Sequence, residues 1–204
     1  SDIICVHTPL TTSGPYPTEH LFSAEVLGRI NPESLLINAG RGAVIDNAAL
    51  LALLESGSSL RVALDVWEGE PSINLSLMEK VALATPHIAG YSIEGKVRGT
   101  EMLAEAFKQL TNANAETLTE QPKTVATLTP ETVSELILAS YDVAEDDLRM
   151  RSALNASSDV AQTFDLLRKQ YPERHEFSCY KFSIDTQQAQ PELRAQALKL
   201  GFRD

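Results

Sequence analysis

The alternation of short apolar runs with helical patterns, in the part of the chain before His87, most constrains the fold. Such alternation is typical of βα units, in which parallel strands are joined by helices that pack on the sheet. The runs that read as buried strands are Ile3–Val6, Leu35–Asn38 and residues 62–65 and 81–84. The chain is therefore predicted to begin with an α/β parallel sheet.

Three helices are expected between and after these strands. Residues 23–30 form a short one, and residues 46–56 form a longer one with Asp46 as N-cap and Gly57 as its stop. Residues 92–110 form a long helix with an apolar stripe that is expected to face a core. The stripe comprises Ile93, Val97, Leu103, Phe107 and Leu110.

The remainder of the chain reads as a separate region. Residues 111–129 are rich in Thr, Asn and Glu and are predicted to be a linker with room for one short strand. The elements expected beyond it are a helix with Thr129 as N-cap, helices at 158–171 and 191–200, and a strand at 177–184 with Tyr180, Phe182 and Ile184 on one face.

These elements predict three parts. Residues 1–110 hold the sheet and the long helix, residues 111–129 form the linker, and residues 130–204 form a small α+β domain. A domain of that size has only a marginal core of its own. It is therefore expected to pack on something else, for example on its own copy.

Charge and composition exclude some classes of partner. The formal net charge of −11 argues against binding to nucleic acid or to an anionic membrane surface. No apolar run approaches the ~20 residues that span a bilayer. Cys5 and Cys179 lie in apolar runs that read as strands, and buried reduced thiols are expected there. This predicts a cytoplasmic protein with no metal site and with a small molecule or a protein as its partner.

Polar and glycine-rich segments follow each of the four expected strands. In open α/β sheets, ligands bind beyond the carboxyl ends of the strands, where the loops converge. These segments therefore predict a site along one rim of the sheet. They are His7-Thr8-Pro9-Leu10, Asn38-Ala39-Gly40-Arg41-Gly42, Asp65-Val66-Trp67-Glu68-Gly69-Glu70-Pro71 and Thr85-Pro86-His87-Ile88-Ala89-Gly90-Tyr91.

Three residues of this rim together suit one reaction. Taken singly, Arg41 reads as an exposed loop residue or a partner of Asp46, His87 as a structural histidine, and Glu70 as a solvated carboxylate. Together they supply what the oxidation of a hydroxy acid requires. Arginine grips the substrate carboxylate through two hydrogen bonds, histidine takes the hydroxyl proton as hydride leaves, and glutamate orients the histidine.

The strings DIICVHTPLT, LLINAGRGAVID, ALDVWEGEP and TPHIAGYS resemble, in order and spacing, the signatures of the NAD-dependent D-isomer-specific 2-hydroxyacid dehydrogenases. The resemblance implies that the chain carries the C-terminal part of a Rossmann-like NAD-binding domain. It implies catalytic roles for Arg41, Glu70 and His87. It also implies that the cofactor-binding residues are Thr8 near the adenosine, Asp65 on the nicotinamide side and Gly90 beside the nicotinamide.

Tyr91 and the later residues narrow the resemblance to a branch of this family that acts on a phosphorylated hydroxy acid. The matching features are Tyr91 after Gly90, the run Tyr141-Asp142-Val143, and Asp146-Asp147. In that branch the C-terminal extension is a dimerisation domain, so a homodimer is implied. Tyr91 would help to hold the phosphorylated substrate, whereas simple packing at a helix start is the alternative.

A complete cofactor site is not expected in this chain. A dinucleotide fold needs a GxGxxG turn that receives the pyrophosphate, and the sequence has none. The spaced glycines Gly95 and Gly99 lie in a helical pattern. The chain alone is therefore expected to bind NAD poorly. The alternatives are another hydroxyacid dehydrogenase, acting on glycerate or phosphoglycerate, and a non-catalytic, dimeric NAD-sensing module.

Overall fold

The computed structural model describes residues 2–111, 123–183 and 191–204. The chain forms two compact units, here called the first unit (Ser1–Ala89 and Val143–Tyr171) and the second unit (Gly90–Asp142 and Pro172–Asp204). This grouping differs from the predicted boundaries, because residues 143–171 pack with the sheet rather than with the C-terminal elements. Most of the predicted linker lies outside the described residues.

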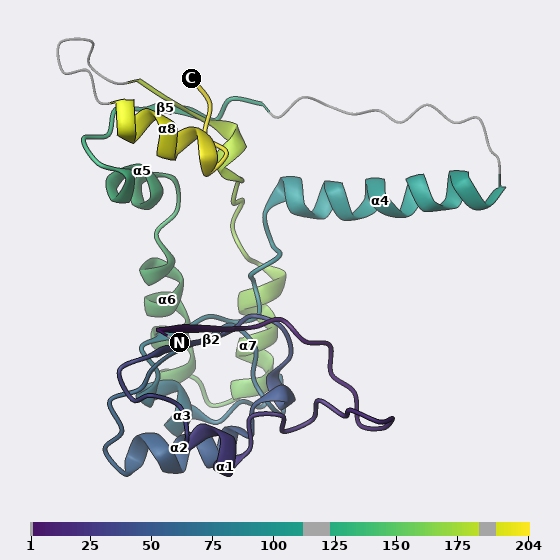
Figure 1. The fold of residues 1–204 in the computed structure, drawn as a ribbon, viewed down its shortest axis with the longest axis vertical. Helices are drawn as coiled ribbons and strands as arrows, with labels where there is room; N and C mark the ends of the chain where they lie inside the picture. The colour runs from purple at the N-terminus through teal and green to yellow at the C-terminus, as the bar shows by residue number, and fades with distance from the viewer. Residues whose placement is uncertain (1, 112–122, 184–190) are drawn as a thin grey trace. The chain divides into compact units, whose positions relative to one another are not determined.

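The first unit is built on a four-stranded parallel sheet, as predicted (Figure 1). Its order follows the sequence: β1 (Ile3–Val6), β2 (Leu35–Asn38), β3 (Arg61–Leu64) and β4 (Leu83–Ala84). β3 begins one residue earlier than predicted, and β4 is shorter. Val6 pairs with Asn38 and Asn38 pairs with Leu64, so the strands end at a common edge.

Short helices follow the strands of the first unit. α1 (Ala24–Leu27) and α2 (Asn47–Glu55) lie within the predicted ranges. The Asp46 side chain accepts a hydrogen bond from the Ala49 amide at 2.8 Å, and Gly57 has a φ of +93°, which confirms both predicted ends of α2. α3 (Leu75–Lys80) is an element that the sequence reading missed.

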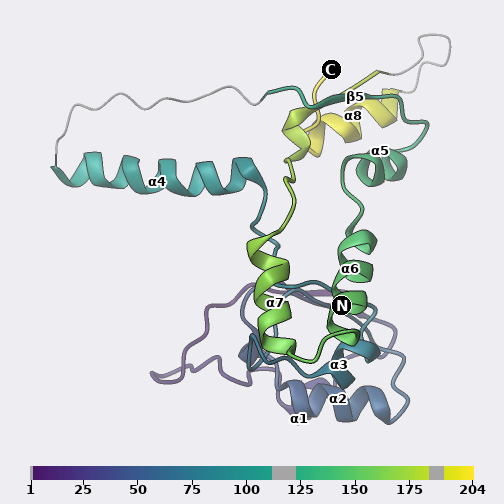
Figure 2. The same cartoon turned by 180° about the vertical axis from the view of Figure 1, so that it is seen from behind.

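Two helices from later in the chain complete the core of the first unit. α6 (Val143–Asn155), which was not predicted, and α7 (Val160–Lys169) lie side by side in both ribbon views (Figures 1 and 2). Their residues Met150, Leu154 and Phe164 are fully buried in the core cluster that contains the strands. Burial of three large apolar side chains contributes several kcal/mol, on the order of 1.5–3 each. This burial is why the unit boundary differs from the prediction.

Arg151 and Asp147 attach α6 to the region of β4. Arg151 pairs with Asp147 at 2.9 Å and donates to the carbonyl oxygens of Met78 and Val81. Asp147 accepts a hydrogen bond from the Ala84 amide at 2.6 Å. A charged pair is thus used to satisfy backbone groups where α3 and β4 meet.

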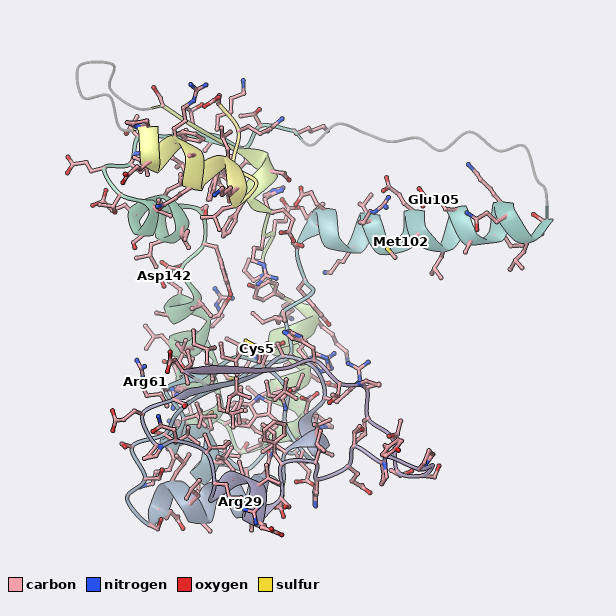
Figure 3. The ribbon with its side chains drawn as sticks, in the orientation of Figure 1. Cys5, Arg29, Arg61, Met102, Glu105 and Asp142 are labelled. Atoms are coloured by element: carbon pink, nitrogen blue, oxygen red, sulfur yellow. The ribbon has the colours of Figure 1, made fainter. Side chains whose placement is uncertain are left out.

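The two faces of the sheet differ in burial. Alternate strand residues point to opposite faces, and Val6, Leu36, Val62 and Leu64 line the buried one. On the other face Ile3 is 60% exposed, and Cys5 and Arg61 are also exposed (Figure 3). The predicted burial of the Cys5 thiol is therefore wrong, because among the described residues little covers this face of β1. Parallel sheets are ordinarily covered on both faces.

The described residues of the second unit form a two-stranded parallel sheet and four helical elements. In chain order these are α4 (Ile93–Thr111), β5 (Ala126–Leu128), α5 (Val133–Ser140), the 3-10 turn η2 (Phe177–Cys179), β6 (Tyr180–Phe182) and α8 (Pro191–Lys199). Leu136, Phe182, Ala197 and Phe202 form its buried core. Ile184, which was predicted to share one strand face with Tyr180 and Phe182, lies outside the described residues.

The N-cap of α5 corrects a prediction. The hydroxyl of Thr132, not of Thr129, accepts the hydrogen bond of the Glu135 amide, at 3.1 Å. The Glu135 carboxylate in turn accepts from the Glu131 amide at 2.9 Å. This reciprocal pattern resembles a capping box, and it explains why the helix begins three residues later.

The apolar stripe of α4 does not face a core within the described part of the chain. α4 has no buried residue there, and Leu103 and Phe107 are 74% and 62% exposed. Met102, which Figure 3 labels together with Glu105, is exposed as well. The predicted burial of this stripe is therefore wrong for the residues described. None of the described helices is both long and apolar enough to cross a membrane.

Candidate active site

The predicted rim of polar segments lies at the carboxyl edge of the sheet of the first unit. β1 to β4 are parallel and adjacent, so the segments that follow Val6, Asn38, Leu64 and Ala84 leave the sheet at the same edge. This arrangement places Arg41, Asp65 and His87 directly after three neighbouring strands. The loop after β3 adds Glu70.

The turn that carries Arg41 is anchored from within. Asn38 is fully buried, and its side-chain amide donates to the Arg41 carbonyl oxygen at 2.9 Å and accepts from the Gly40 amide at 3.1 Å. A methyl group on Gly42 would lie 2.0 Å from the carbonyl carbon of Trp67. Only glycine allows that approach, which fixes the Arg41 turn against the loop that leads to Glu70.

The Arg41 side chain is exposed beside this anchored turn. Its Nη1 donates to the Gly40 carbonyl oxygen at 2.8 Å, and none of the ion pairs found among the described residues includes it. Asp46 was the alternative partner predicted for Arg41. It instead caps α2, and its Oδ2 atom lies 3.8 Å from Nδ1 of His20. The guanidinium therefore keeps most of its donors available for a ligand carboxylate.

Glu70 and His87 form a direct pair. The Nδ1 atom of His87 lies 2.8 Å from Oε2 of Glu70, and the other oxygen of Glu70 accepts from the Trp67 amide at 2.6 Å. An ionised carboxylate only accepts hydrogen bonds, so Nδ1 carries the hydrogen and Nε2 is the atom that can take a proton. The pair is thus arranged as a general base with its orienting group.

Asp65 shapes the turn that presents His87. Its Oδ1 accepts from the Thr85 hydroxyl at 2.6 Å and from the Ile88 amide at 2.8 Å, and Oδ2 accepts from the Ala89 amide at 2.9 Å. His87 has a φ of +57°, an uncommon conformation for a residue with a side chain. Asp65 is only 8% exposed, so this buried carboxylate stabilises the unusual backbone. Its predicted position beside a nicotinamide stays a prediction.

Thr8, Gly90 and Tyr91 differ in how they relate to the rim. Thr8 lies in the segment after β1. Its hydroxyl oxygen is buried and has no hydrogen-bond partner among the described residues, which suits a polar atom that binds a ligand. Gly90 and Tyr91 belong to the second unit, where the Lys96 ammonium lies 4.2 Å from the centre of the Tyr91 ring. Their roles stay predictions.

A second histidine–carboxylate pair was missed in the sequence. Nε2 of His20 lies 2.7 Å from Oε1 of Glu68, and this hydrogen bond raises the pKa of His20. Glu68 also exchanges two hydrogen bonds with Asn47, at 3.1 and 3.2 Å. In the sequence, the only signal for this pair was the position of Glu68, two residues before Glu70. The pair is the natural control for experiments on His87.

Trp67 is a further residue whose role was missed. Its amide holds Glu70, its indole donates to the Thr85 carbonyl oxygen at 3.0 Å, and its side chain is buried. It is the only tryptophan of the chain, and its position just before the Glu-Gly-Glu sequence was a possible signal.

Comparison with known proteins finds family matches for two parts of the chain. Residues 1–89 match the family described as "D-isomer specific 2-hydroxyacid dehydrogenase, NAD binding domain", and residues 113–201 match a domain family of unknown function, DUF3410. A solved structure with partial likeness is D-lactate dehydrogenase from Aquifex aeolicus, at 28% identity and a TM-score of 0.45 over 55% of this chain and 38% of that one.

Curated relatives match almost the whole chain. It is 41% identical to erythronate-4-phosphate dehydrogenase of Saccharophagus degradans, over 98% of the chain and 54% of the relative. It is 45% identical to the protein of that name from Edwardsiella ictaluri, over 91% of the chain and 51% of the relative. The chain spans about half the length of the curated relatives it matches. Residues 1–89 of the chain are therefore similar to the NAD binding domain of the D-isomer specific 2-hydroxyacid dehydrogenases.

Proposed function

We propose that the protein oxidises the 2-hydroxy acid 4-phosphoerythronate to the corresponding 2-oxo acid with NAD, in the route to pyridoxal phosphate. The observation that carries this proposal is the hydrogen-bonded pair of His87 and Glu70 at the carboxyl edge of the sheet, next to the turn of Arg41. The names of the curated relatives supply the substrate.

Each of the three residues has a distinct task. Arg41 binds the substrate carboxylate through two parallel hydrogen bonds and so sets the position of the hydroxyl-bearing carbon. Nε2 of His87 takes the proton of the hydroxyl group while the hydrogen on that carbon departs as hydride, which leaves a carbonyl group. Glu70 stabilises the resulting imidazolium through Nδ1. When bound, NAD supplies the acceptor of the hydride.

The cofactor would be held by Thr8, Asp65 and Gly90 on this chain. The hydroxyl oxygen of Thr8 is buried and has no hydrogen-bond partner in the described part of the chain, which supports a ligand at that end of the rim. The sequence contains no GxGxxG turn for the pyrophosphate. The chain's own residues thus fit one part of the cofactor only.

Two further features belong to the proposal. Tyr91 would contact the phosphorylated substrate, and residues 130–204 would mediate a homodimer, in keeping with the exposed apolar residues Leu138, Leu198 and Leu200 of the second unit. Cys5 and Cys179 are both free thiols, which suits the reducing cytoplasm.

The test is the kinetics of a His87→Ala variant of the full-length protein. Turnover of 4-phosphoerythronate should fall at least ~100-fold, because a general base is lost. The matched control is His20→Ala, which removes another histidine that pairs with a glutamate and should leave turnover within a few-fold. Near-normal activity of His87→Ala would refute the assigned role. If the unaltered protein turned over glycerate or 3-phosphoglycerate as fast as 4-phosphoerythronate, the proposed substrate assignment would be refuted.

A further inference from the structure

A cluster of three potential metal ligands lies in the second unit, and none of its members is among the residues assigned to catalysis. Glu94 is in the first turn of α4, while His175 and Cys179 precede β6. One ligand atom from each of these side chains lies within 4.8 Å of the other two. Nδ1 of His175 is 2.8 Å from Oε1 of Glu94. The three donors therefore already converge on one small volume.

The backbone around the cluster is tied together. The Ile93 amide donates to the Arg174 carbonyl oxygen at 2.9 Å, and the Glu176 amide donates to Oε2 of Glu94 at 2.9 Å. Figures 1 and 2 both show the chain that enters α4 beside the segment that leads to η2. The Ser92 hydroxyl also donates to the Glu176 carboxylate. These bonds hold the segments that carry the three donors in a fixed relation.

Burial adds to this preorganisation. Cys179 is fully buried, and the side chains of Glu94 and His175 are 26% and 23% exposed. The remaining access faces the carboxylate and the imidazole. A water molecule can therefore reach the cluster, although the sulfur atom itself is shielded.

We propose that Glu94, His175 and Cys179 bind one Zn²⁺ ion, with water as the fourth ligand. Thiolate, imidazole and carboxylate are the three ligand types that zinc takes in proteins, in tetrahedral geometry. The charges also balance, since one thiolate and one carboxylate neutralise the dication. Binding breaks the S–H bond of Cys179, forms a Zn–S bond and releases one proton to solvent.

The same atoms form a hydrogen-bond network in the absence of metal, and this is the competing explanation of the cluster. Burial acts to raise the pKa of Glu94, but hydrogen bonds from His175, the Glu176 amide and Cys179 outweigh it and lower the pKa to about 2. Burial is also the main cause that raises the pKa of Cys179 to about 11. Zinc must therefore displace a thiol proton, and only a binding measurement separates the two explanations.

Ligand spacing along the sequence did not reveal this site. His175 and Cys179 are four positions apart, but Glu94 is 81 positions from His175, so the sequence alone does not bring the third donor to the other two. A bound ion would join the start of α4 to the segment before β6. It would thus act on the folding of the second unit rather than on the proposed oxidation.

The experiment measures zinc in the full-length protein, prepared without a histidine tag or chelator. Mass spectrometric metal analysis should find one zinc ion per protein chain. Co²⁺ substitution should produce a thiolate-to-cobalt charge-transfer band in the near ultraviolet. Cys179→Ser and His175→Gln should each weaken zinc binding at least ~100-fold in competition with a chromogenic chelator, since changes outside the ligand shell already cost about 10–100-fold.

Matched controls separate this site from others. Cys5→Ser removes the other cysteine, and His20→Gln removes the histidine of a second cluster, His20, Asp46 and Glu68. Both variants should bind zinc normally and keep the cobalt band. If Cys179→Ser fails to fold by circular dichroism, Glu94→Gln and His175→Gln provide the affinity test with the thiol intact. No zinc at saturating metal, no charge-transfer band, or loss of binding in Cys5→Ser or His20→Gln would overturn the proposal.

Discussion

His87 is held by two carboxylates that perform different tasks. Glu70 bonds the ring at Nδ1 and so leaves Nε2 to exchange a proton with a ligand. Asp65 bonds the backbone amides after His87 and stabilises its positive φ. The side chain that suits general base chemistry is therefore oriented through both its ring and its main chain.

Asp65→Asn tests the second of these tasks. Asparagine has one acceptor oxygen in place of two, so the Thr85, Ile88 and Ala89 donors cannot all be satisfied. The free energy of unfolding should fall by about 1–3 kcal/mol, the cost of a buried unpaired group. Urea unfolding followed by Trp67 fluorescence measures this change. The control Asp46→Asn keeps a good N-cap and should change stability by under about 0.5 kcal/mol; equal losses in both variants would contradict the assignment.

Arg41→Lys tests the proposed carboxylate grip. Lysine keeps the charge but cannot form two parallel hydrogen bonds with one carboxylate. The full-length variant should show a higher KM for the hydroxy acid and a lower kcat/KM, by at least ~10-fold, which is about 1.4 kcal/mol of lost interaction. Steady-state kinetics at several substrate concentrations measures it. An unchanged dependence on substrate would exclude the bidentate geometry.

At the scale of elements, the site depends on how closely two loops approach. The turn after β2 and the loop after β3 meet at Gly42 and Trp67, where a methyl group would be 2.0 Å from the Trp67 backbone. Neighbouring parallel strands bring the loops to the same edge, and the missing side chain at Gly42 allows them to touch.

Gly42→Ala should therefore disrupt this contact. The added methyl group forces one backbone segment to move, and the free energy of unfolding should fall by about 1–3 kcal/mol or more. Gly99→Ala is the contrasting change, because Gly99 lies exposed in α4 with no atom within 4 Å of the added Cβ. It should stabilise the protein by about 0.5–1 kcal/mol. Urea unfolding by circular dichroism compares the two, and similar effects would argue against the close approach.

Predictions of individual elements succeeded where a local signal was sufficient. β1 and β2 have the predicted bounds, and Asp46 caps α2 as predicted. α3 is only six residues long, too short for a clear helical period. The choice between Thr129 and Thr132 as N-cap depended on which one had Glu135 three residues later, and Thr132 does.

At the scale of the whole molecule, the chain order does not follow the grouping in space. α6 and α7 come from the region predicted as the C-terminal domain, yet their apolar residues belong to the core of the first unit. No local pattern reports which core an amphipathic helix will join, because the same apolar stripe suits any apolar surface. The apolar stripe of α4 is the opposite case, because it was predicted to face a core but is exposed among the described residues.

The sequence by itself determined the parallel sheet, the rim of polar segments and the three candidate residues Arg41, Glu70 and His87. Strand patterns and glycine turns are local, and the carboxyl ends of parallel strands must share an edge. Only the tertiary structure decided that Glu70 bonds His87 at Nδ1, that Asp65 shapes the turn of His87, and that Glu94 meets His175 and Cys179. Those contacts join residues far apart in the chain, so they depend on packing that no local pattern encodes.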